Sequence, residues 1–222
     1  IQQEGGILEA DWKRVSLDST RLETAGFNRF MVQLQDGNIV LGRFGSPLNI
    51  YVADRAQFEP LVPGALRNAR DLWQDREGYA WVVGDTGGIC RLSIGYAGRT
   101  PNGDTLDITT DLYCISDEQG VESDLTRHRI ISPDGEHLFV NTNRGIYLYR
   151  RDDLMQATND PGHRVVGILL SRYFEVPLEG NGGVQQAGLL TKRGQIVFPT
   201  TSGLITIDPD TILKTLALEV FQ

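Results

Sequence analysis

The stretch LWQDREGYAWVVGDTGG (72–88) contains the pattern that decides the fold. Two apolar, strand-like runs flank a short polar turn that ends in glycine, and a second glycine closes the segment. The same pattern recurs in VQLQDGNIVLGRFG (32–45), RIISPDGEHLFVNTNRG (129–145) and LLTKRGQIVFPTTSG (189–203). A polar residue followed by glycine between two such runs is a strong hairpin signal, because the tight turn requires a positive φ. The sequence therefore predicts the same hairpin four times.

Glycine accounts for 25 of the 222 residues, and the repeat explains much of this excess. The first glycine of each segment is placed in the hairpin turn: Gly37, Gly78, Gly135 and Gly194. The second ends the second strand: Gly45, Gly88, Gly145 and Gly203. A large apolar residue stands three positions after each turn glycine: Val40, Trp81, Leu138 and Val197. A third strand is expected after each second glycine, and GGILEADWKRVSLD (5–18) resembles this later half of the repeat.

The turn glycines are separated by 41, 57 and 59 residues. A period of roughly 40–60 residues with three or four short strands is typical of a propeller blade. The predicted fold class is therefore all-β: a β-propeller with four to five blade equivalents of four-stranded antiparallel sheet, which pack face to face. An immunoglobulin-like sandwich is the alternative, but it does not require one hairpin four times. We expect a single domain over 1–222, divided into a half blade over 1–25 and blades at about 26–66, 67–124, 125–183 and 184–222.

Charge and patterning exclude several classes of protein. The chain has 21 basic and 29 acidic side chains, a net charge of −8, which argues against nucleic-acid binding through the overall field. The apolar runs are short, so no direct membrane insertion is expected. The start, IQQEGGILEADWK (1–13), lacks the features of a signal peptide and an initiator Met, which indicates a processed or excised piece. Two long connections, 94–126 and 151–187, are expected as surface loops, with a helical turn at RDDLMQA (151–157).

Two cysteines, Cys90 and Cys114, are too few for a disulfide scaffold or a CxxC metal site. They can form a disulfide if the strands that hold them are neighbours. They can equally be two small buried side chains.

Two segments resemble the two-component regulator propeller repeat. In DREGYAWVVGDTGGICRL (75–92), Trp81, Gly84 and Thr86 match the repeat together with the two glycines that follow. The stretch 178–212 is similar to the last blade of such propellers, including its terminal GL and DP pairs. The hairpins at 32–45 and 129–145 are degenerate, since valine and leucine replace the tryptophan.

The resemblance implies a bacterial signal-transduction receptor in which the propeller is the periplasmic or extracytoplasmic sensor domain and binds a ligand. In that family a membrane-spanning helix and a histidine kinase or diguanylate cyclase follow the propeller. The resemblance also implies a seven-bladed ring, whereas this chain shows four hairpins and one half blade. The alternatives are an arc of a larger ring and a small closed ring in which GILEADWKRVSL (6–17) pairs with TLALEVF (215–221). An open arc exposes blade faces, so we expect it to self-associate.

A candidate ligand site follows from the register. The residues eight positions before the four turn glycines are Arg29, Arg70, Arg127 and Gln186. Their polar neighbours are Asn28, Asn68, His128 and Gln185. If the blades are equivalent, these side chains converge on one mouth of the central channel, where arginine can bind carboxylate or sulfate oxygens in pairs. We therefore expect an anionic or polyhydroxylated ligand, such as an oligosaccharide. The alternative is that the arginines bond carbonyl groups of the adjacent blade and hold the ring together.

Catalytic motifs are not recognisable, so the chain is not predicted to be an enzyme. His128, His137 and His163 lack the spacing of zinc ligands. No Walker loop, nucleotide-binding fingerprint or G-x-S-x-G elbow is present, and no cofactor is predicted. A propeller glycosidase or lyase is the weaker alternative, because its carboxylates cannot be selected from 29 acidic residues by sequence. A protein–protein or dimerisation scaffold is the stronger alternative to a ligand sensor.

Overall fold

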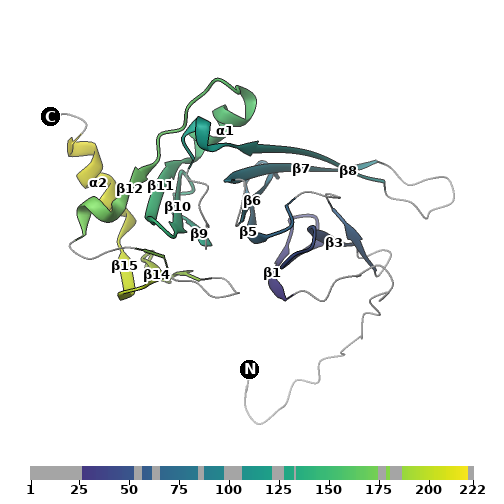
Figure 1. The fold of residues 1–222 in the computed structure, drawn as a ribbon, viewed down its shortest axis with the longest axis horizontal. Coiled ribbons are helices and arrows are strands. Elements are labelled where there is room, and N and C mark those ends of the chain that lie inside the picture. Colours follow the sequence, from purple (N-terminus) through teal and green to yellow (C-terminus); the bar gives the residue numbers. More distant parts are fainter. Residues whose placement is uncertain are drawn as a thin grey trace, which may run out of the picture.

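The computed structural model describes residues 27–52, 57–61, 66–84, 88–97, 107–121, 128–132, 134–174, 179–180 and 187–219. Within these ranges most regular structure is antiparallel β-sheet, divided among four separate sheets. The sheets follow one another in chain order along an arc, as Figure 1 shows. We call them blades 1 to 4. The predicted all-β propeller architecture is confirmed.

Each blade is a simple meander in which consecutive strands pair. Blade 1 consists of β1 (Asn28–Gln33), β2 (Ile39–Arg43), β3 (Asn49–Val52) and β4 (Gln57–Pro60). Blade 2 consists of β5 (Ala69–Gln74), β6 (Ala80–Gly84), β7 (Ile89–Ala97) and β8 (Asp107–Ile115). Blade 3 consists of β9 (His128–Ile131), β10 (His137–Thr142), β11 (Gly145–Arg150) and β12 (Ile168–Leu169). Blade 4 has three described strands, β13 (Leu189–Leu190), β14 (Ile196–Thr200) and β15 (Gly203–Ile207).

The hydrophobic cores lie between the blades, because each blade is one sheet thick and must bury its faces against a neighbour. The core between blades 1 and 2 includes Val40, Ile50, Leu72, Val82 and Leu92. The core between blades 2 and 3 includes Trp73, Trp81, Ile89, Leu138 and Tyr149. The core between blades 3 and 4 includes Phe139, Ile146, Leu148, Ile196 and Phe198. The predicted face-to-face packing is therefore present three times.

The repeated glycines have the backbone conformation that the hairpins require. The turn glycines Gly37, Gly78, Gly135 and Gly194 have φ of 88°, 89°, 76° and 80°. The second glycine of each segment also has a positive φ, and at Gly88 a Cβ atom would lie 2.5 Å from the carbonyl oxygen of Ile115. Glycine is the residue that adopts this conformation without a steric cost, so the repeat has a backbone cause.

One predicted equivalence is wrong, because the third hairpin has an extra residue in its turn. In blades 1, 2 and 4 the backbone hydrogen bond that closes the turn joins residues four positions apart; in blade 2 the Asp75 amide donates to the Tyr79 carbonyl. In blade 3 the equivalent bond joins residues five positions apart, from the Ser132 amide to the His137 carbonyl. The extra residue shifts the alternation of faces by one. Leu138 consequently faces the preceding blade, blade 2. Phe139 faces the following blade, blade 4, and is therefore the equivalent of Trp81, which faces blade 3 from blade 2.

Asp75 organises the hairpin of blade 2 and connects it to blade 3. Its carboxylate is 5% exposed and accepts hydrogen bonds from the amides of Glu77 (3.0 Å) and Tyr79 (2.9 Å) and from the indole of Trp81 (2.8 Å). Arg151, at the start of the helix between β11 and β12 of blade 3, pairs with Asp75 (3.2 Å) and with Glu77. The aspartate of the repeat motif is therefore a buried acceptor for three donors of its own hairpin and one from the next blade.

Asp134 has the corresponding role at the surface of the third hairpin, and it predicts a pH dependence. Burial raises the pKa of Asp134, but hydrogen bonds from Ser132, from the Glu136 amide and from His137 outweigh it and hold the pKa below its usual 3.8. A carboxyl group with a lowered pKa stabilises the folded state above its unfolded pKa, and this contribution is lost as the pH falls through the folded value. We expect Asp134→Asn to reduce the unfolding free energy at pH 7 by no more than about 1 kcal/mol, since the group is partly exposed. Urea titrations should show this difference disappearing below pH 3.8; a difference that is independent of pH would contradict the assignment.

The long connection between β11 and β12 of blade 3 contains the predicted helical turn. It is α1 (Arg151–Asn159), which packs on β8 and β11. The connection between blades 2 and 3 contains the short helix η2 (Asp117–Gln119), and η3 (Leu170–Tyr173) follows β12.

The closed-ring alternative requires a strand at 215–221, and the structure does not form it where these residues are described, over 215–219. Residues Pro209–Glu219 form helix α2. Asp208 caps this helix by accepting hydrogen bonds from the amides of Asp210 (3.1 Å) and Thr211 (3.3 Å), and proline suits the first helical position because its missing amide is not needed there. The half blade expected over 1–25 lies outside the described residues.

Candidate functional site

A small cavity lies where the chain enters the innermost strand of blade 2. Its volume is about 180 Å³, and it is bounded by residues 66–68 before β5, the end of β6, the start of β7 and the end of β8. Arg67 and Asn68 provide polar side chains, whereas Leu66, Val82 and Leu112 provide apolar surface. We call it the loop-face cavity. Of the predicted site residues that the structure describes, Asn68 lines this cavity.

Arg29 and Arg70 are structurally equivalent, as predicted, since each lies at an irregularity of the innermost strand. The pairing of β1 with β2 shifts between Asn28 and Phe30, and that of β5 with β6 shifts between Ala69 and Asp71. A bulged residue is commonly re-aimed relative to its neighbours in the strand. The common spacing to the turn glycine therefore identifies a real repeated position.

The side chain of Arg29 has a structural role. It is 5% exposed, its guanidinium lies 4.7 Å from the centre of the Phe44 ring, and it donates a hydrogen bond to the carbonyl oxygen of Asn68 (3.0 Å). The Asn68 side chain in turn accepts a hydrogen bond from the Gly45 amide (3.0 Å). Arg29 thus joins blade 1 to blade 2, which is the alternative that the sequence left open.

The remaining predicted site residues are only partly brought together. Asn68 lines the loop-face cavity, Arg70 is half-buried and does not, and Asn28 is exposed at the start of β1. His128 begins β9. Arg127, Gln185 and Gln186 lie outside the described residues.

The structure adds Arg67 and a disulfide to the surroundings of the cavity. Arg67 is exposed and lies next to Asn68 in the same loop, but a count from the turn glycine selects Arg70 instead. Cys90 and Cys114 lie directly opposite each other in the β7–β8 pair and are bonded. Cys90 is buried in the core between blades 1 and 2, and Cys114 is exposed.

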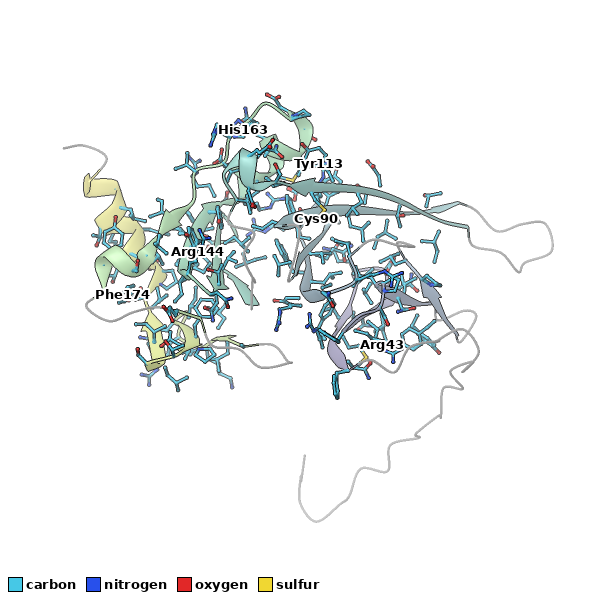
Figure 2. All side chains as sticks on the ribbon, viewed as in Figure 1. Arg43, Cys90, Tyr113, Arg144, His163 and Phe174 are labelled. Carbon is cyan, nitrogen blue, oxygen red and sulfur yellow. A yellow bond between two sulfur atoms is a disulfide. The ribbon has the colours of Figure 1, made fainter. Side chains whose placement is uncertain are left out.

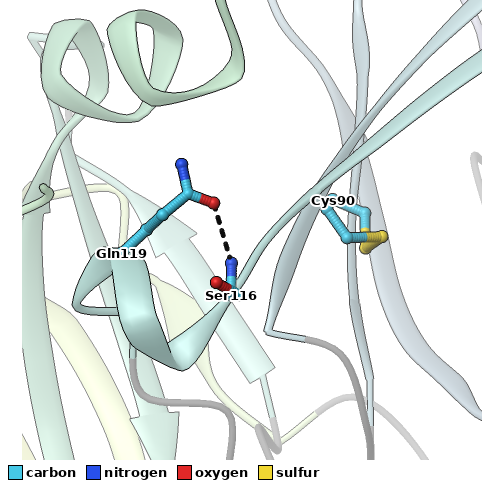
Figure 3. The surroundings of a disulfide bond; sticks show 4 residues. Cys90, Ser116 and Gln119 are labelled. Atoms are coloured by element: carbon cyan, nitrogen blue, oxygen red, sulfur yellow. Dashed lines mark hydrogen bonds between the residues drawn. A yellow bond between two sulfur atoms is a disulfide. The ribbon is translucent and has the colours of Figure 1, made fainter. Parts of the chain in front are cut away.

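Beyond the disulfide, β8 continues into a short segment that is fixed to α1 (Figure 3). Gln119 accepts a hydrogen bond from the Ser116 amide (3.2 Å) and donates one to the carbonyl oxygen of Ala157 (3.2 Å). Its own carbonyl accepts the amide of Val165 (2.7 Å). The outer edge of blade 2 is therefore held at both its disulfide and its junction with blade 3.

A second, larger hollow lies beside blade 3, between α1 and α2, with a volume of about 770 Å³. Leu148, Ile168, Leu213 and Leu216 provide apolar lining, and the polar lining includes Glu136, Arg150 and Asp152. Asp153 supports one wall through hydrogen bonds with His163 (2.5 Å) and the Val166 amide (3.0 Å); His163 is labelled in Figure 2. The volume of this second hollow is in the range of small-molecule pockets, but none of the predicted site residues that the structure describes lines it.

The fold is similar to that of solved extracellular domains of bacterial signalling proteins. One belongs to a protein described as a hybrid two-component system, BT3049 from B. thetaiotaomicron: the TM-score is 0.57 at 16% identity, over 85% of this chain and 22% of that chain. Another, from BT4673 of the same organism, gives a TM-score of 0.52 at 15% identity, over 81% and 21% of the two chains. The chain thus resembles these extracellular domains and spans about a fifth of their length.

No protein-family model and no curated protein matches the chain. In the described part of the chain, no group of three or more His, Cys, Asp or Glu side chains is arranged to hold a metal ion. No helix among the described residues is long and apolar enough to cross a bilayer.

Proposed function

We propose that this chain is part of the extracytoplasmic sensor propeller of a bacterial signal-transduction receptor, and that it binds a ligand without catalysis of its own. The likeness in fold to extracellular domains of two-component systems supports the proposal. The repeat motif around Trp81 supports it independently, since it resembles the regulator propeller repeat.

The disulfide supports the extracytoplasmic location. Disulfides persist in oxidising compartments such as the periplasm and the cell exterior, and they are rare in the reducing cytosol. Cys90 and Cys114 are bonded across neighbouring strands, and the described residues contain no free cysteine. This chemistry is independent of the comparison with known structures.

The observation that carries ligand binding is the loop-face cavity, which combines a guanidinium and an amide with an apolar floor. Arg67 provides paired donors for carboxylate or sulfate oxygens, and the Asn68 side chain provides donors and acceptors for hydroxyl groups. A glycosidase uses a pair of carboxylates, and none of the described residues that line this cavity is a carboxylate. We therefore propose an anionic or polyhydroxylated small molecule as the ligand, such as an oligosaccharide fragment whose terminal uronate or sulfated sugar enters the cavity.

Calorimetric titration with uronate and sulfated disaccharides tests this site. Arg67→Ala should weaken binding about tenfold, because it removes a charge-assisted hydrogen bond. Arg70→Ala should lower the melting temperature more than Arg67→Ala, since Arg70 has the position of the structural Arg29. Arg193→Ala, an exposed arginine in the hairpin turn of blade 4, is the matched control and should change neither property. Equal weakening by Arg67→Ala and Arg193→Ala would show that the anions bind to the overall charge and not to the cavity.

A protein–protein scaffold is the second candidate function. It is favoured by apolar side chains on the end blades of the arc: Phe27 and Met31 of blade 1 are 71% and 67% exposed, and Leu204 of blade 4 is 78% exposed. Titration separates the two functions, because a scaffold without a small-molecule site would give no heat with either disaccharide.

A further inference from the structure

The disulfide forms part of the wall of the loop-face cavity. Cys90 and Cys114 both line this cavity, together with Arg67 and Asn68. The two cysteines lie directly opposite each other in the β7–β8 pair and are bonded. One part of the cavity wall is therefore a covalent bond that a thiol can cleave by exchange.

The two cysteines differ in their access to solvent. Cys90 is 2% exposed and packs in the core between blades 1 and 2, whereas Cys114 is exposed. In thiol–disulfide exchange the attacking thiolate must reach one of the two sulfur atoms, and access is one of the factors that decide which. A small thiol can therefore reach Sγ of Cys114, while the core shields Sγ of Cys90.

The strands that carry the disulfide are also held by other contacts. β7 pairs with β8 over nine residue pairs, between Ile89–Ala97 and Asp107–Ile115. Beyond the bond, Gln119 donates a hydrogen bond to the carbonyl oxygen of Ala157 and its own carbonyl accepts the amide of Val165; Figure 3 shows Gln119 and the disulfide in the same view. Opening the bond leaves β8 anchored on both sides, so the exchange can take place in the folded chain.

Arg67 gives the cavity a preference for a thiol that carries an acidic group. Its guanidinium provides paired donors for carboxylate or sulfonate oxygens, and none of the described residues that line the cavity is a carboxylate. The protein as a whole has a net charge of −8, so its overall field repels an anionic reagent. The cavity and the rest of the molecule thus favour opposite charges, which makes the contribution of the cavity measurable.

We propose that Cys114 is a thiol-exchange site, at which a small thiol with a carboxylate or sulfonate group becomes bonded to the protein in the loop-face cavity. The thiolate sulfur attacks Sγ of Cys114, the bond between the two cysteines breaks, and Sγ of Cys90 leaves as a thiolate and takes up a proton. One disulfide replaces another, so the step needs no further oxidant or reductant. The attached group occupies the cavity and excludes another ligand from it. Only this last consequence rests on the proposed function.

The rate at which small thiols open the disulfide of the unaltered chain tests this site. The anionic probe is 2-mercaptoethanesulfonate and the neutral probe is 2-mercaptoethanol; protein thiols are alkylated and counted by mass spectrometry. We expect the anionic probe to react about tenfold faster per thiolate, because it gains a charge-assisted hydrogen bond from Arg67. An equal or slower reaction of the anionic probe would overturn the proposal, since the net charge alone predicts that order.

Variants of one arginine assign the preference to the cavity. Arg67→Ala should remove the preference for the anionic probe, and Arg67→Lys should retain part of it because the charge remains. Arg193→Ala, in the hairpin turn of blade 4, is the matched control and should keep the full preference. Circular dichroism should show all three variants folded, because both arginines are exposed. A preference that survives in Arg67→Ala, or is lost in Arg193→Ala, would overturn the proposal.

Peptic mapping at low pH identifies the sulfur atom that is attacked. After a brief exposure to 2-mercaptoethanesulfonate that is stopped with acid, the probe should be on the peptide that contains Cys114, and Cys90 should be a free thiol. A probe attached to Cys90, or a bond that opens only in denaturant, would overturn the proposal. None of these measurements uses a sugar, so failure of the exchange and failure of the proposed ligand binding are distinguishable.

Discussion

Replacing Asp75 by asparagine is expected to lower the unfolding free energy by about 3 kcal/mol. All four groups that contact its carboxylate are donors: two amides, the indole of Trp81 and the guanidinium of Arg151. An asparagine side chain has the same shape, but its amide nitrogen would face donors in either orientation. The substitution also leaves Arg151 without one of its two carboxylate partners. Guanidinium unfolding followed by far-ultraviolet circular dichroism measures the loss.

Asp36→Asn is the control for this prediction. Asp36 lies in the corresponding hairpin of blade 1, but it is exposed. Within the described part of the chain its carboxylate bonds only to Asn38, through that residue's amide (2.9 Å) and side chain (3.2 Å). We expect a loss below about 1 kcal/mol, as is usual for an exposed group. If both substitutions cost the same, the contacts that Asp75 makes with Trp81 and Arg151 do not stabilise the fold.

Removing the disulfide, by Cys90→Ala with Cys114→Ser, is expected to cost about 3 kcal/mol. The two cysteines are 24 residues apart in sequence, and the bond restricts the unfolded chain over this loop. Alanine suits the buried position 90 because a serine hydroxyl would be buried in the core between blades 1 and 2, whereas serine suits the exposed position 114. Denaturant unfolding under oxidising conditions gives the loss directly.

Reduction provides the internal control for the disulfide. Dithiothreitol should lower the stability of the unaltered chain toward that of the double variant and should not change the double variant. If the reductant destabilised both chains equally, or neither, the bond would not be the source of the difference.

The repeat and its turns could be predicted from the sequence, because a positive φ is a local requirement and glycine meets it with little cost. The equivalence of Leu138 with Trp81 failed because one extra residue in a turn changes the face of every residue after it, and the turn glycine alone does not show this. The strand that the closed-ring alternative places at 215–221 is a helix over its described residues for a different reason. Asp208 and Pro209 were interpreted as the end of a blade motif, although the same pair is a signal for the start of a helix.

For the candidate site, the equivalence of two positions could be predicted from the sequence, but the contacts of their side chains could not. Spacing placed Arg29 and Arg70 at equivalent positions, and both lie at irregularities of the innermost strands. Spacing cannot show where a long side chain bonds, and Arg29 bonds a carbonyl of the next blade. The disulfide was left open for a similar reason, since it depends on which strands are neighbours and not on the residues near each cysteine.

The position of the cores between the sheets determines how stability accumulates in this architecture. A single blade has no interior of its own, so the elementary unit of folding is the seam between two blades, and the described arc has three seams for four blades. Each blade added to an open row adds one seam, together with the entropic cost of ordering its chain. The final seam forms between the first and the last blade and closes the row into a ring. It carries no further entropic cost of ordering a segment of chain, because both blades are already formed. Closure is therefore the most favourable single step in the assembly, whichever chain provides the closing face.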